Sequence, residues 1–111
     1  MNLPYDSPKL DIVLSALANQ KRRGILHELS LNPATVSHLA HEFKISLPAI
    51  HKHVRILESA DLIIRKKSGR TNFLALNAKT LSLAQRWLGQ YKTQWGTVDA
   101  SLSNYIARMQ E

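Results

Sequence analysis

A mainly helical fold with one small β-hairpin is predicted by three features of this 111-residue chain. Before residue 60, residues that commonly cap helices precede apolar positions at helical spacing. Two runs of alternating apolar side chains then flank a glycine. The C-terminal third repeats apolar residues in steps of three and four. With 44% apolar residues and only four glycines, the chain can bury the core of one domain over residues 1–111.

The first two helices are expected to run from Pro8 to about Ala18 and from Gln20 to about Ser30. Ser7 is a typical N-cap before a proline in the first turn, and Asn19 can cap the second helix. Asn32-Pro33 then ends the second helix. The apolar face of the first helix consists of Leu10, Val13, Leu14 and Leu17.

A helix-turn-helix is predicted over about residues 35–59. Thr35 can cap a short helix through about Phe43, and Ser46 can cap the next one after a tight turn. Lys44 lies where such turns usually have glycine, because the backbone there is left-handed; a lysine accepts this at roughly 1 kcal/mol. The apolar set expected to hold the two helices together is Val36, Leu39, Ala40, Phe43, Ile45, Ile50, Val54 and Leu57.

The hairpin, or wing, is expected over about residues 62–77. Its strands are Leu62–Lys67 and Asn72–Asn77, joined by Ser68-Gly69-Arg70-Thr71. A helix-turn-helix followed by such a hairpin is a winged helix-turn-helix, a fold that places its second helix in a DNA major groove.

The remaining residues predict one long C-terminal helix over about residues 78–109, which only Gly96 would weaken. Its heptad seam is too long for the domain to cover, so a second copy is expected to cover it and form a homodimer. The seam contains Leu81, Ala84, Leu88, Tyr91, Trp95, Val98, Leu102, Tyr105 and Met109. Leu10, Val13, Leu14 and Leu17 are the expected second dimer contact. Trp87, Tyr91, Trp95 and Tyr105 could alternatively line an effector pocket.

Charge indicates a polyanionic partner, which we expect to be double-stranded DNA. The net charge is +7 and the isoelectric point about 10.1. Residues 46–76 hold six of the Lys and Arg residues against two acidic ones. Without cysteine the chain has no disulfides and no thiolate metal sites. No signal peptide or membrane-spanning run is recognisable, so a cytoplasmic location is expected.

A set of basic and small side chains is predicted to contact DNA. Ser46 would aim the helix N-terminus at a phosphate, while His51 or Lys52 could donate to guanine. Arg70, at the tip of the wing, could enter a minor groove. The alternative is an ordinary solvated helix face and a hairpin kept soluble by its charges. The predicted DNA-binding residues are Ser46, Leu47, Pro48, Ala49, His51, Lys52, His53, Arg55, Arg65, Lys66, Lys67 and Arg70.

These motifs resemble the ArsR-type winged-helix transcriptional repressors over almost the whole length. ALANQKRRGIL is similar to the family's opening, SLPAIHKHVRILESADLI to its recognition-helix signature, and NFLAL to the return strand of the wing. WLGQYKTQWGTVDASLSNYI resembles the tail of members that do not sense metals. Two departures stand out: Asp61 replaces the family glycine before the wing, and the third helix lacks the thiolate metal motif. The resemblance implies that Arg22 and Arg23 match a partly structural arginine pair, and that His53 matches a family histidine.

The resemblance and the residues together predict a homodimeric repressor that acts on an inverted-repeat operator. The alternatives are a winged-helix protein-interaction module and a ligand- or metal-responsive sensor without strong sequence-specific DNA binding. His38 and His41 lie one helical turn apart and could share a zinc ion, but no metal site or cofactor is expected. No enzyme is predicted either, because the four Asp and four Glu residues are dispersed and no nucleophile–base grouping is present.

Overall fold

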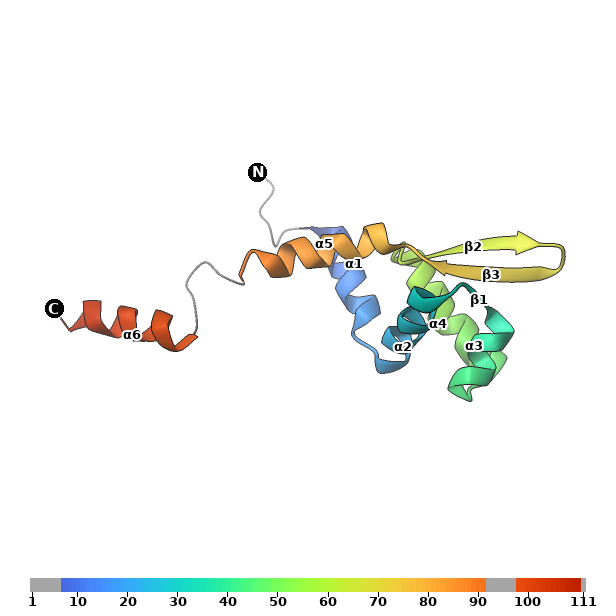
Figure 1. Ribbon diagram of the computed structural model, residues 1–111, viewed down its shortest axis with the longest axis horizontal. Helices are drawn as coiled ribbons and strands as arrows, with labels where there is room; N and C mark the ends of the chain where they lie inside the picture. Colours follow the sequence, from blue (N-terminus) through green and yellow to red (C-terminus); the bar gives the residue numbers. More distant parts are fainter. Residues whose placement is uncertain (1–6, 92–97, 111) are drawn as a thin grey trace.

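The structure is a computed structural model that describes residues 7–91 and 98–110. Figure 1 shows a cluster of short helices from which a hairpin projects on one side, while the last helix is set apart on the other. The predicted fold class is confirmed: the described part is mainly helical with a small antiparallel sheet. The elements are α1 (Pro8–Leu17), α2 (Gln20–Leu31), β1 (Ala34–Thr35), α3 (Val36–Phe43), α4 (Leu47–Ser59), β2 (Ile63–Ser68), β3 (Thr71–Leu76), α5 (Ala78–Gly89) and α6 (Val98–Met109).

The first four helices begin where the sequence predicts. In each of them the residue before the helix has an extended backbone, and its side-chain oxygen accepts a hydrogen bond from the backbone N–H three residues later. These bonds are 3.1 to 3.3 Å long. Each satisfies one of the amides that a helix N-terminus leaves unpaired. The four capping residues are Ser7, Asn19, Thr35 and Ser46.

The core lies where the first four helices pack against one another and against the sheet. Its largest fully buried side chains come from the first four helices, from the residue before β2, and from β3: Val13, Ile25, Leu39, Ile50, Val54, Leu57, Leu62 and Leu74. Leu10 is 3% exposed and Val13 is 0% exposed within the single chain. The prediction that these two form a dimer contact is therefore wrong, because α1 turns that face toward its own domain. Helical spacing identifies an apolar face but not what covers it.

Two residues other than glycine have a left-handed backbone conformation. Lys44 ends α3 with φ 54° and ψ 44°, and its own N–H and that of Ile45 bond the last carbonyls of α3. Asp61 has φ 61° between α4 and β2. The helix-turn-helix and the lead into the wing therefore keep the usual backbone path without glycine. A non-glycine residue accepts this conformation at a cost of about 1–2 kcal/mol.

The sheet has one strand more than the sequence predicts. The order is β1-β3-β2, and β1 pairs with β3 through Ala34↔Leu74 and Thr35↔Phe73. A two-residue strand shows no alternation, so periodicity could not reveal it. The hairpin strands are each shifted by one residue from the predicted bounds, and Ser68 pairs with Thr71. The turn therefore has two residues rather than four, and Gly69 takes φ 62° in its first position.

The single C-terminal helix predicted over residues 78–109 is wrong. Helix α5 ends at Gly89, residues 90 and 91 form a turn, and α6 begins at Val98. A heptad pattern reports on which side a helix is apolar, not on whether the helix is continuous. Gly89 has low helix propensity, and Leu88 and Tyr91 near it are 58% and 60% exposed, so these two side chains gain little burial within the described part of the chain that would favour continuing α5. Gly96 and Trp95 lie outside the described residues.

Candidate nucleic-acid interface

The N-terminal half of α4 presents the predicted DNA-facing side chains on one side. Leu47 is 49% exposed, and Pro48 and Lys52 are also exposed, while Ala49 and His51 are half-buried. The opposite side of α4 is formed by three fully buried residues of the core. Because these buried residues fix the rotation of the helix, the exposed side chains are held in a defined direction. Arg55 lies one turn beyond Lys52 and is exposed.

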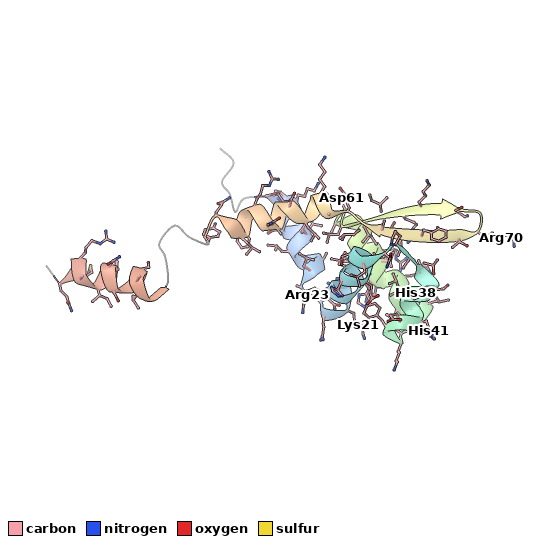
Figure 2. The ribbon with its side chains drawn as sticks, viewed as in Figure 1. Lys21, Arg23, His38, His41, Asp61 and Arg70 are labelled. Atoms are coloured by element: carbon pink, nitrogen blue, oxygen red, sulfur yellow. The ribbon has the colours of Figure 1, made fainter. Side chains whose placement is uncertain are left out.

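The tip of the wing carries a second group of exposed cations. Figure 2 shows Arg70 at the far end of the hairpin. Lys66 and Lys67 precede the turn on β2 and are exposed as well. The two-residue turn at Gly69 keeps the strands paired to their ends, so these cations lie on a ribbon with regular strand pairing.

A cleft of about 220 Å³ joins the two groups. Leu47 and His51 line it from α4, and Arg70 lines it from the wing tip. The β1–β3 pairing places the start of α3 beside the wing, so that polar groups from α3 and β3 complete the lining. The residues that sequence reasoning missed here are Thr35, Val36, Ser37, Thr71 and Asn72. The signal that could have found them is their position: each is within three residues of a helix cap or the hairpin turn.

Arg65 is not a free cation of the wing. Its Nη2 and Nε donate to Glu58 at 2.7 and 3.2 Å, which makes a two-point ion pair between β2 and the end of α4. The hydrogen bond to Glu58 raises the pKa of Arg65. Contact of Arg65 with DNA stays a prediction, and the guanidinium already has a charged partner in this structure. Arg65 attaches the wing to the end of α4.

His53 faces back toward the helical body. Burial, together with the nearby charges of Arg22, Lys21 and Lys52, lowers the pKa of His53. Nη1 of Arg22 lies 3.5 Å from Nδ1 of His53. Arginine is only a donor, so Nδ1 has to be the acceptor, and the neutral ring then carries its proton on Nε2. The contact fixes the position of α4 against α2, which is the helix-holding role rather than a readout role.

Arg22 and Arg23 cap the C-terminal end of α1. Arg22 donates to the carbonyls of Ala16 and Ser15 at 2.7 and 3.2 Å, and Arg23 donates to that of Leu17 at 2.8 Å. The Ser15 carbonyl also accepts a hydrogen bond from the N–H of Ala18, while the carbonyls at the end of a helix generally lack partners within it, and cations are favourable at this end of a helix dipole. The arginine pair therefore has the structural role that the resemblance implies.

The structure also places the predicted dimer residues and the pair His38 and His41, for which no metal site is expected. Among residues 7–91 and 98–110, no three His, Asp or Glu residues gather as metal ligands. Leu14 and Leu17 are half-buried against the core. The exposed apolar side chains of the C-terminal part, with 44–70% of their surface accessible, are Leu88, Tyr91, Leu102, Tyr105, Ile106 and Met109. Trp95 and the side chain of Val98 lie outside the described residues. None of the described helices is long and apolar enough to cross a membrane.

Comparison with known proteins connects this geometry to a group of regulators. A family model described as a helix-turn-helix domain matches residues 17–65. The chain is 30% identical over 90 residues to the HTH-type transcriptional regulator Rv2034 of Mycobacterium tuberculosis, and the match covers 81% of this chain and 82% of that protein. It is 32% identical over 76 residues to the transcriptional repressor SdpR of Bacillus subtilis, covering 68% and 84% of the two chains.

A solved structure agrees with these relatives. The crystal structure of an ArsR family transcriptional regulator superposes with a TM-score of 0.72 and 36% sequence identity. The match covers 78% of this chain and 90% of that one. Fold, sequence and the position of the basic surface therefore point to the same class of protein.

Proposed function

This chain belongs to the ArsR-type winged helix-turn-helix transcriptional regulators, and we propose that it is a homodimeric repressor that binds an inverted-repeat operator. Regulation of transcription and DNA binding follow from the family. The finer proposal concerns which residues read the operator, how many copies bind, and the sign of the regulation.

The observation that carries the proposal is the cleft shared by the N-terminal half of α4 and the tip of the wing. A B-DNA major groove admits an α-helix, and the phosphates on its rim lie within reach of a neighbouring hairpin. Lys52 and His51 contact base edges in this arrangement. Arg70, with Lys66 and Lys67, contacts the flanking backbone or minor groove. Phosphate contacts set the register, and base contacts set the sequence preference.

A dimer is supported by the apolar side chains that α5 and α6 leave exposed. Four large apolar residues lie within eight positions of α6, at spacings of three and four: Leu102, Tyr105, Ile106 and Met109. A single copy would leave this stripe in water, which stable soluble helices avoid. Two copies that pack these stripes together present two recognition helices, and a two-fold protein pairs with a two-fold operator.

The test is selection of genomic fragments on the purified full-length chain, at about 150 mM salt with excess random competitor DNA. We expect a few inverted-repeat sites near promoters, and repression of transcription from those promoters in a purified system. Uniform recovery of all fragments would contradict sequence-specific binding. Activation of the recovered promoters would contradict the repressor assignment.

A matched pair of variants locates the readout. Lys52→Ala should weaken binding to the selected site by about 10-fold or more, since a good base contact contributes about 1–3 kcal/mol of discrimination. Arg108→Ala removes the same charge from an exposed position on α6 and should leave affinity unchanged. Equal affinity of the two variants for the selected site would show that Lys52 of α4 does not read the operator sequence.

A further inference from the structure

A second polar hollow lies at the opposite end of the wing from the DNA-facing cleft. Figure 2 shows Asp61 at the root of the hairpin and Arg70 at its tip. The hollow has a volume of about 400 Å³ and is formed by α1, by the residues that lead into β2 and into α5, and by α5 itself. Its lining residues are Lys9, Asp61, Asn77, Lys79, Thr80, Ser82, Leu83 and Arg86.

This root pocket carries more positive than negative charge. Lys9, Lys79 and Arg86 line it, and Asp61 is the only carboxylate among the described residues that line it. The Lys9 Nζ–Asp61 Oδ2 distance is 3.9 Å, and both side chains are 61% exposed, so this ion pair is weak. Lys79 and Arg86 are exposed as well. Two cations from α5 and one from α1 therefore converge on one hollow, and a single carboxylate leaves a net charge of +2.

The hydrogen bonds of Asn77 leave further donors in the root pocket. Asn77 occupies the N-cap position of α5, but its side chain makes no capping bond. Its Nδ2 instead donates to the carbonyl oxygen of Asp61 at 2.9 Å and to Oγ1 of Thr80 at 3.2 Å. The N–H of Thr80 already donates to the backbone carbonyl of Asn77 at 3.1 Å, so the amides of Ala78 and Lys79 are the first amides of α5 that no side chain caps. An acceptor on a ligand would complement both these amides and the three cations.

From this geometry we propose that the root pocket binds a small dianion, such as a phosphate or dicarboxylate metabolite, and that its occupancy changes DNA binding. Lys9, Lys79 and Arg86 supply the charge that matches the dianion. Half-buried Leu83 offers an apolar wall for a short carbon skeleton. Binding exchanges the weak Lys9–Asp61 contact for a contact with the ligand.

The same residues connect the root pocket to the wing, so the regulatory part rests on the proposed function. The N–H of Asn77 donates to the carbonyl of Leu62 at 2.8 Å, and Asn77 Nδ2 holds the carbonyl of Asp61. Both ends of the hairpin are therefore fastened at the pocket. Asp61 also has the left-handed backbone that sets the direction of β2. A ligand that displaces Asp61 from Lys9 acts on the residue from which the wing starts.

The binding part is tested by titrating the full chain with inorganic phosphate, and separately with succinate, at constant ionic strength. The readout is the amide NMR signals of Lys79, Thr80 and Ser82. We expect saturable shifts with half-saturation at about 1 mM or below for at least one probe. Comparing half-saturation by phosphate with half-saturation by succinate shows whether the pocket prefers a phosphate or a dicarboxylate. Linear drift without saturation for both probes would overturn the proposal, because that is the behaviour of charge screening.

Two charge-matched double variants locate the binding. The double variant Lys79→Gln with Arg86→Gln should bind the probe that gives saturable shifts at least about 10-fold more weakly, since each lost contact is charge-assisted. Lys44→Gln with Arg108→Gln removes the same charge from exposed positions outside the root pocket and should leave half-saturation unchanged. Equal weakening in both double variants would place the binding elsewhere.

The regulatory part is tested with the selected operator, by fluorescence anisotropy with and without the active probe at matched ionic strength. We expect the probe to change operator affinity at least about 3-fold in the unmodified chain and not in the Lys79/Arg86 double variant. An equal change in both, or none in either, would overturn regulation through the root pocket. A chain that binds no operator even without probe would contradict the proposed function, while the NMR titration would still decide on the pocket.

Discussion

Helices α4 and α6 are similar in sequence character but opposite in environment. Both are short and amphipathic, with 13 and 12 residues. The apolar stripe of α4, which includes Ile50 and Val54, is fully buried, and its polar side forms the candidate interface. The apolar stripe of α6 includes Leu102 and Met109, which are 54% and 70% exposed. Amphipathicity therefore predicts that a stripe has to be covered, but the chain itself covers only one of the two.

The largest expected effect comes from the stripe that the domain covers. Ile50→Ala should lower the free energy of unfolding by about 2–5 kcal/mol, because it leaves a cavity in a fully packed core. Leu102→Ala should change it by less than about 0.5 kcal/mol under dilute conditions, where α6 has no partner copy. Urea unfolding followed by circular dichroism measures both. A large loss in Leu102→Ala would mean that α6 packs on its own domain.

The polar side of the domain should determine how DNA binding responds to salt. Replacing Lys66, Lys67 and Arg70 together with alanine should reduce the slope of log K against log salt by about 2–3, since each phosphate contact contributes about 0.9. Arg65→Ala is the control within the same strand, because Glu58 holds that guanidinium, and it should leave the slope nearly unchanged. Binding isotherms between about 50 and 200 mM salt supply the slopes. A decrease of about 0.9 in the slope for Arg65→Ala would show that the Arg65–Glu58 ion pair opens when DNA binds and that Arg65 then contacts a phosphate.

The stripe that the domain leaves uncovered should control oligomeric state. Leu102→Glu places a charge in the apolar stripe of α6 and should weaken dimerisation by at least about 10-fold, since an unpaired charge is costly to bury. Ser103→Glu adds the same charge on the next, exposed residue and should leave the dimer intact. Sedimentation equilibrium distinguishes the two. Dimers of unchanged strength in Leu102→Glu would move the interface away from α6.

A smaller effect concerns the turn that orients α4. Lys44→Gly should raise the free energy of unfolding by about 1 kcal/mol relative to Lys44→Ala, because φ 54° suits glycine better than any residue with a Cβ. The alanine variant removes the same side chain but keeps the strained backbone. Chemical denaturation of the two variants measures the difference in their free energies of unfolding. Equal stability would show that the turn relaxes without strain.

The smallest effect is the pH dependence that His53 contributes. Its pKa is lowered in the folded chain, so below pH 6.5 the unfolded chain binds more protons and stability falls as pH decreases. The contribution is complete above pH 6.5 and is lost as pH falls through the folded-state pKa. His53→Gln should flatten this part of the stability profile between about pH 7 and 5. Identical profiles for both chains would mean that neither burial nor the charge of Arg22 opposes protonation of His53.

Local rules succeeded where a few neighbouring residues decide the outcome. The four caps, the left-handed turn at Lys44 and the glycine turn of the wing depend on short stretches of backbone, and the structure confirms each. Local rules were wrong where distant residues decide. The heptad pattern gave no information on the end of α5 at Gly89, and helical spacing could not tell that Val13 faces its own core. Arg65 was grouped with the wing cations because Glu58, seven residues away, lies on another element.

The sequence by itself determined the first four helices, the wing, the family and the side of the molecule that carries the cations, because spacing and charge are properties of the chain. Only the tertiary structure decided which cations are free. Arg22, Arg23 and Arg65 hold elements together, while Lys52 and Arg70 remain exposed to solvent. It also brought Lys9 and Arg86 to the root of the wing. The physical reason is that a charge acts through the groups within a few ångströms of it, and folding chooses those neighbours from anywhere in the sequence.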